Sequence, residues 1–118
     1  MLHHIVFFKF KPDTDENWIK ALEGMLDNLP NVILEIQTFE FGRDVVRSDR
    51  SYDFALVSGF ANLDAMKRYQ VHPEHQKVLA LVRAICEDVK AVDFESEYTS
   101  VEGQDPADAP KGFSSPPR

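Results

Sequence analysis

The four histidines of this chain lie in two clusters, and imidazole is the side chain whose charge ordinarily changes near neutral pH. His3 and His4 are adjacent near the start, while His72 and His75 flank a proline further along. Tyr69 lies six residues before His75. A neutral imidazole can act as a general base or a hydrogen-bond acceptor, and a tyrosine hydroxyl can donate to an oxygen that gains negative charge. These residues predict acid–base chemistry, or recognition of a small polar group.

The elements that carry these residues are expected to bring three of them together. Residues 2–11 alternate as a strand, which places His4 on the face that a helix would cover. Pro73 predicts a helix start, because proline is favoured at the first helical position. His75 then lies in the first turn, where the positive end of the helix dipole disfavours an imidazolium. We expect His75 to act as base, Tyr69 as its partner and His4 to position the substrate.

Apolar residues at matching spacings predict a small cleft around this site, since ligand pockets are mostly apolar with a few convergent polar groups. The expected wall residues are Val6, Phe8, Phe54, Leu56, Val78, Leu79 and Val82. A simpler interpretation stays open, because a half-buried histidine beside a tyrosine often only satisfies the hydrogen bonds of both groups.

Neither a metal nor a cofactor is expected. His72 and His75 with Glu74 offer ligands, but the intervening proline need not let them converge, and His4 would have to complete the set. The five glycines are scattered and form no phosphate-binding loop. Cys86 is interpreted as a core residue, and the carboxylates of the last strand are expected to be solvated or paired with lysine and arginine.

The order of elements predicts an α+β fold. The expected strands are residues 2–11, 32–42, 52–60 and 90–98. One helix is expected after Asp15, ending at Leu29, a short one over residues 62–69, and a third from Pro73. The apolar stripe expected on the first helix is Trp18, Ala21, Leu22, Met25 and Leu29. This β-α-β-β-α-β order is that of a ferredoxin-like, four-stranded antiparallel sheet with helices on one face.

The second face of that sheet predicts a partner. Helices can cover only one face, and the other would expose Ile5, Phe7, Ala55, Val57, Val92 and Phe94. Exposed apolar patches of this kind mark interfaces. We therefore expect a homodimer in which two sheets close face to face as a dimeric α+β barrel.

Composition narrows the function classes. The 118 residues suit one domain, expected over residues 1–98, followed by a flexible tail over 99–118 that holds four of the seven prolines. A net charge of −7 argues against nucleic-acid and anionic-membrane partners. No apolar run approaches the roughly 18 residues of a membrane span, and the start does not resemble a signal peptide. The single cysteine excludes an internal disulfide and fits the cytoplasm.

Four separated blocks of sequence together resemble a known family. LHHIVFFKFK, YDFALVSGF, YQVHPEH and VDFE are similar to blocks of the stress-responsive A/B barrel (Dabb) family, over residues 2–96. The resemblance implies a dimeric α+β barrel. One member is a cofactor-free plant polyketide cyclase, and the resemblance places its base, assisting tyrosine and first-strand histidine at His75, Tyr69 and His4. A further cyclase histidine corresponds to Phe54, where this chain departs from the cyclase.

Three functional hypotheses remain. The first is a Dabb homodimer with a small, mostly apolar cleft, which binds a small organic ligand or serves a structural, stress-related role. The second is a cofactor-free cyclase, lyase or isomerase in which His75 is the general base. The third is an interaction module whose histidines are only structural. Catalysis and ligand binding both need a cavity into which His75 and Tyr69 point.

Overall fold

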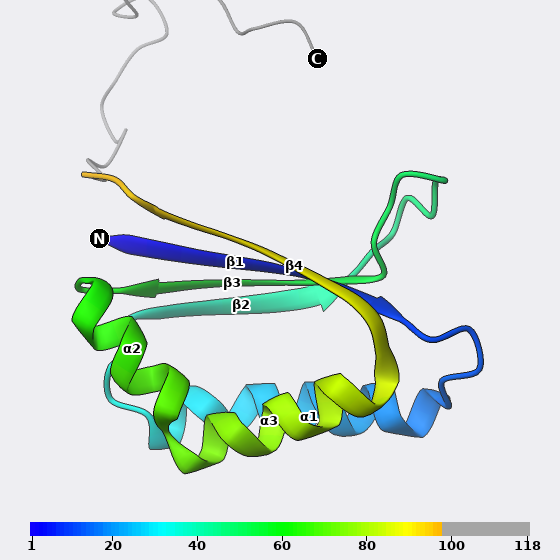
Figure 1. Ribbon diagram of the computed structural model, residues 1–118, viewed down its shortest axis with the longest axis horizontal. Coiled ribbons are helices and arrows are strands. Elements are labelled where there is room, and N and C mark those ends of the chain that lie inside the picture. The colour runs from blue at the N-terminus through cyan, green and yellow to red at the C-terminus, as the bar shows by residue number, and fades with distance from the viewer. Residues whose placement is uncertain (98–118) are drawn as a thin grey trace, which may run out of the picture.

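The computed structural model describes residues 1–97, which form one sheet with helices on one side (Figure 1). In chain order the elements are β1 (Leu2–Phe10), α1 (Glu16–Val32), β2 (Thr38–Arg43), β3 (Phe54–Phe60), α2 (Leu63–Val71), α3 (Pro73–Ile85) and β4 (Cys86–Glu95). The four strands pair antiparallel in the order β2-β3-β1-β4. The expected ferredoxin-like fold is confirmed. The expected tail, residues 99–118, lies outside the described residues.

β1 is one of the two inner strands of the sheet. It pairs with β3 on one side and β4 on the other, so that Val6 lies opposite Leu56 and Ala91. Its side chains alternate as the sequence indicates, because successive residues of a strand point to opposite faces. His4 and the other even-numbered residues from Leu2 to Phe8 are buried beneath the helices.

α1 begins as expected but extends further and is rotated relative to the predicted stripe. Asp15 caps it by accepting a hydrogen bond from the Asn17 backbone N–H at 2.7 Å. The helix does not end at Leu29: it continues through Pro30, because a proline in the last turn removes only one backbone hydrogen bond and its fixed φ is helical.

The buried face of α1 is offset from the stripe that the sequence suggested. Leu22, Leu26 and Leu29 are its buried residues, whereas Trp18 is 56% exposed. Both the predicted stripe and the observed buried residues recur every three or four positions. Only contact with the sheet decides which of the two faces is buried.

Among the strand boundaries, the starts of β2 and β4 differ most from the expected ones. β2 begins at Thr38 rather than residue 32, because the chain first ends α1 with the Ile33 backbone N–H bonded to the Leu29 carbonyl. β4 begins at Cys86 rather than residue 90, directly after α3. The tight connection makes β4 a long edge strand beside β1.

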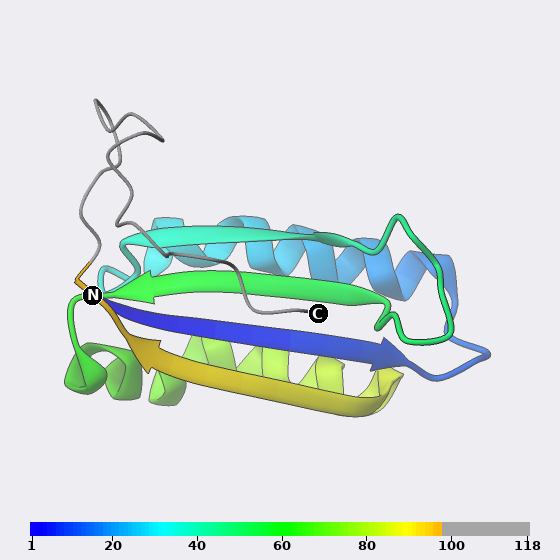
Figure 2. The same ribbon diagram turned by 90° about the horizontal axis from the view of Figure 1, so that it is seen from above.

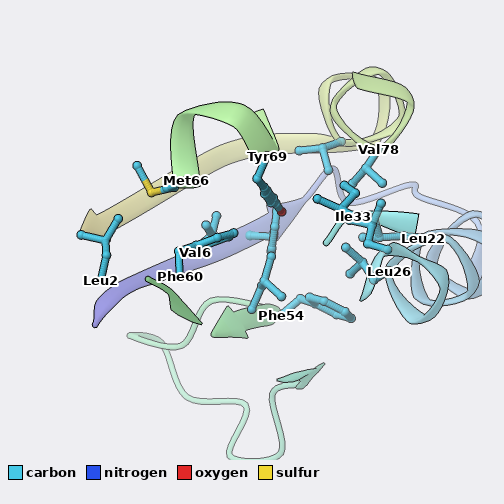
Figure 3. Packing of buried hydrophobic residues seen from close by; sticks show 14 of the residues in the cluster. Leu2, Val6, Leu22, Leu26, Ile33, Phe54, Phe60, Met66, Tyr69 and Val78 are labelled. Carbon is cyan, nitrogen blue, oxygen red and sulfur yellow. The ribbon is translucent and has the colours of Figure 1, made fainter. Parts of the chain in front are cut away.

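The core lies between the helices and one face of the sheet (Figure 3). Phe60 and Tyr69 meet there with ring centroids 4.9 Å apart, and Leu22 and Leu26 pack from α1. Burial of this apolar surface is the main driving force for folding. The described residues include no helix long and apolar enough to cross a membrane.

Within residues 1–97, no helix or strand covers the opposite face of the sheet, as Figure 2 shows from above. We call it the open face; its apolar residues are Ile5, Phe7, Ala55, Val57, Val92 and Phe94. Four of them are more than 40% exposed: Phe7, Val57, Val92 and Phe94. The expected second apolar face is therefore present on the protein surface.

The offset of α1 gives a direct stability test. Replacing Leu22 with alanine should lower the free energy of unfolding by roughly 2–5 kcal/mol, because it leaves a cavity in the core. Trp18→Ala, the matched control on the same helix, should cost about 1 kcal/mol or less. Urea unfolding at fixed protein concentration measures both. A larger loss for Trp18→Ala than for Leu22→Ala would contradict the observed rotation of α1.

Candidate functional site

A cavity of about 420 Å³ lies between α2, α3 and the β1–β4 side of the sheet. It is lined by His4, Tyr69 and His75, so the structure brings the three predicted polar residues to one space. Six of the seven predicted apolar wall residues also line it: Val6, Phe8, Leu56, Val78, Leu79 and Val82. Sequence reasoning did not anticipate the contributions of Leu26, Gln70, Val71, Gln76, Val89 and Ala91.

Phe54 does not line this cavity, and its predicted position is wrong. The ring is 1% exposed and packs against Phe8, Phe10 and Phe41, with centroids 5.7, 6.0 and 5.9 Å away. β3 lies between β1 and β2, so Phe54 points into the part of the core below α1, away from β4. Alternation gives the correct face of the strand but not the position across the sheet.

A break between α2 and α3 orients His75. His72 caps α3 by accepting a hydrogen bond from the Glu74 backbone N–H at its Nδ1, 3.1 Å away. In an unbroken helix that N–H would donate to the Gln70 carbonyl. The carbonyl instead accepts from His75 Nδ1 at 3.1 Å and from the Gln76 side-chain amide at 2.6 Å. The break therefore supplies the acceptor that fixes the His75 ring.

His75 is held neutral with a defined tautomer. Burial lowers the pKa of its imidazole, and the Gln70 carbonyl opposes this effect only partly. A carbonyl oxygen can only accept, so His75 Nδ1 carries the hydrogen, and Nε2 is left as an unprotonated nitrogen. A buried, unprotonated imidazole nitrogen at a cavity wall can accept a hydrogen bond or a proton.

Tyr69 lies between the two cavity histidines. Its ring is perpendicular to that of His75, with centroids 4.2 Å apart, and 6.3 Å from that of His4. Burial raises the pKa of its hydroxyl well above the usual range. The group therefore stays protonated near neutral pH and is available as a hydrogen-bond donor.

Asp93 is the site residue that sequence reasoning missed. It lies opposite His4 in the β1–β4 pairing, and its carboxylate accepts a hydrogen bond from His4 Nδ1. The β4 carboxylates were expected to be solvated or paired with lysine and arginine; Asp93 is exposed to solvent, but its partner is a histidine. The pair follows from which residues of β1 and β4 lie opposite each other. The spacing of residues within either strand gives no information about this register. The carboxylate holds the His4 ring through Nδ1 and thereby orients its Nε2 edge.

Other candidate chemistry is weaker in the described residues. No group of three or more histidine, cysteine or acidic side chains in this part of the chain is placed to hold a metal ion. Cys86 is half-buried, and burial raises the pKa of its thiol to about 11, so it is a poor nucleophile near neutral pH.

The site thus sits in a ferredoxin-like α+β domain, under helices that cover one face of a four-stranded antiparallel sheet. A dimeric ferredoxin-like protein of unknown function from Thermobifida fusca has the same fold, with a TM-score of 0.73 and 30% identity; the match covers 79% of this chain and 88% of that one. A hydroxynitrile lyase from Passiflora edulis shares the fold at 20% identity, with a TM-score of 0.74 and coverage of 84% and 95%.

The chain belongs to the stress responsive A/B barrel domain (Dabb) family, whose sequence pattern matches residues 2–96. A stress-response A/B barrel domain-containing protein of Arabidopsis thaliana is 31% identical over 97 residues. That match covers 80% of this chain and spans 36% of the length of the Arabidopsis protein. The resemblance seen in the sequence is thereby confirmed at the level of the family.

The lowered His75 pKa predicts a pH dependence of stability. The folded state resists protonation of this ring, so the unfolded chain binds the proton more readily as the pH falls below about 6.5. The contribution of His75 is fully present above that pH and is lost as the pH falls through the lowered pKa. His75→Gln should flatten this part of the profile, measured by urea unfolding from pH 5 to 8. An unchanged slope in the variant would show that His75 is not held neutral by the fold.

Proposed function

We propose that the protein is a homodimer that binds a small organic molecule in the cavity beneath α3. The observation that supports this most is the cavity itself, whose walls are apolar while His4, Tyr69 and His75 meet in it. Binding pockets for small molecules typically combine such walls with a few convergent polar groups. The single cysteine fits a reducing compartment, and we place the protein in the cytoplasm.

The polar groups favour an uncharged ligand with both donor and acceptor atoms. The unprotonated nitrogen of His75 offers an acceptor, the Tyr69 hydroxyl offers a donor, and His4 adds an imidazole ring held by Asp93. Among the described residues, no lysine or arginine lines the cavity. A ligand with a permanent negative charge would therefore lose hydration without gaining a counter-charge.

The open face supports the homodimer. Face-to-face association would cover Phe7, Val57, Val92 and Phe94, which otherwise expose apolar surface to water. The Thermobifida fusca protein with this fold is dimeric. Closure of two such sheets would form the α+β barrel expected from the sequence, with a second copy of this chain as the partner.

A charge placed on the open face should separate the protomers. Val57→Lys should raise the dimer dissociation constant at least about a hundredfold, because an unpaired ammonium would be buried between the sheets. Leu34→Lys changes a residue that is 92% exposed and lies away from that face, so it should leave the constant unchanged. Sedimentation equilibrium measures both. Equal constants for the two variants would argue against this interface.

Filling the cavity should abolish ligand binding. Leu79→Trp, on the wall, should weaken binding of the uncharged probe N-phenyl-1-naphthylamine at least about tenfold, as followed by its fluorescence. Leu81→Trp, on the same helix but outside the cavity lining, is the matched control and should bind the probe like the parent protein. Circular dichroism verifies that both variants fold. If neither substitution alters binding, the probe does not occupy this cavity.

A second candidate function is cofactor-free acid–base catalysis, favoured by the unprotonated His75 Nε2 and by the Tyr69 ring, which packs against the His75 ring in the same cavity. In this hypothesis His75 removes a proton from a carbon next to a carbonyl group. The electron pair of the C–H bond moves to the carbonyl oxygen, and the Tyr69 O–H stabilises the resulting enolate by a hydrogen bond. His4, held by Asp93, positions the substrate. The Passiflora edulis protein is a hydroxynitrile lyase, so the fold is compatible with lyase chemistry.

Exchange of a carbon-bound proton tests this second function without knowledge of the natural substrate. In deuterated buffer, the protein should accelerate deuterium uptake at the methyl group of acetophenone, followed by proton NMR. His75→Gln should lower that acceleration about a hundredfold or more, because the base is lost. His72→Asn keeps a helix-capping side chain and should leave it intact. Equal exchange with parent and His75→Gln proteins would leave ligand binding as the function.

A further inference from the structure

The loop between β2 and β3, residues 44–53, projects from the sheet on the side away from the helices (Figure 1). It therefore rises on the same side as the open face. Shortly after the end of β2 it carries two adjacent valines, Val45 and Val46, which are 90% and 73% exposed. Two neighbouring apolar side chains so fully in water form a small surface without an evident partner in the described part of the chain.

This loop is held in its conformation by the protein itself. The Asp44 backbone N–H donates to the Asp53 carbonyl at 2.9 Å, and the Asp44 carboxylate accepts from the Arg47 N–H at 2.6 Å. Asp53 is tied to β1, because its N–H donates to the Phe8 carbonyl at 2.9 Å. Arg47 has a φ of 56°, a left-handed conformation that is unfavourable for a residue other than glycine. The loop thus presents the valines from a strained, internally bonded turn.

The charges beside the valines are already paired within the loop. The Arg47 guanidinium lies 2.9 Å from the Asp53 carboxylate and 3.7 Å from that of Asp44. Two carboxylates against one guanidinium leave this part of the loop slightly negative, and the whole chain carries a net charge of −7. A membrane with anionic lipids or a nucleic acid would find little positive charge here. The chemistry suits an apolar protein surface.

The loop and the open face form one continuous surface. A hollow of about 280 Å³ at the base of the loop is lined by Phe7 and Ala55 from the open face and by Arg50 and Tyr52 from the loop. A molecule that covers the open face at this end of the sheet would reach the loop residues that line this hollow, including Asp44, which Val45 and Val46 directly follow.

We infer that Val45 and Val46 contact the second copy of this chain, so that each protomer holds its partner with this loop as well as with its open face. The inference rests on the proposed homodimer and adds a contact that the sheet alone does not supply. A turn that is ordered before association loses little conformational freedom on binding, which favours a tight contact.

Mixed dimers provide a direct test. One protomer carries ¹³C-labelled valine and leucine methyl groups and the other is unlabelled, and isotope-filtered NOEs are recorded between them. Val57 and Val92 report on the open face, Val45 and Val46 on the loop, and Leu34 serves as the exposed residue expected to show none. NOEs from both valine pairs support the inference. NOEs from Val57 and Val92 alone overturn it while leaving the homodimer intact, and a monomer without any NOE overturns both.

Substitution gives a second, quantitative test. The double variant Val45→Ser with Val46→Ser should raise the dimer dissociation constant at least about tenfold, because apolar contact area is lost on both sides of a symmetric interface. Both valines are exposed in the protomer, so its fold should be unaffected. Leu34→Ser, equally exposed, should leave the constant unchanged. A double variant with the parent constant would overturn the proposed loop contact.

Discussion

The sheet has apolar side chains on both faces, and the helices of the described residues cover only one of them. β1 sends Val6 and Phe8 toward the helices, and Ile5 and Phe7 toward the open face. The covered face forms the core and determines where α1 and α3 lie. The uncovered face leaves apolar surface in water, which a second copy can bury. Both the candidate site and the proposed assembly follow from this asymmetry.

The site depends on where the helical connection between β3 and β4 is divided into α2 and α3. Had α2 continued into α3, the Gln70 carbonyl would have accepted a hydrogen bond from the Glu74 N–H, and His75 would have lacked its acceptor. The capping histidine, His72, takes that N–H, and the freed carbonyl fixes the neutral ring. The pair of His4 and Asp93 forms independently, from strand register. Two separate local structures therefore orient the polar groups of the cavity: the break between α2 and α3, and the pairing of β1 with β4.

Patterns within single elements predicted most of the fold. The alternation of β1 gave the correct face for His4, and Pro73 at the start of α3 placed His75 in the first turn. The failures concern relations between elements. Asp93 was missed because its role depends on a cross-strand partner, and Phe54 was misplaced because alternation does not reveal the position across a sheet. Trp18 shows the same limit for α1, whose buried face is chosen by the sheet.

The need to cover the open face is the central claim, and the mass of the unmodified protein in solution tests it most directly. Size-exclusion chromatography with multi-angle light scattering at micromolar concentration should give twice the 13.5 kDa mass of the chain. A mass of 13.5 kDa that persists as the concentration is raised would contradict the account, because the open face would then be stable in water on its own.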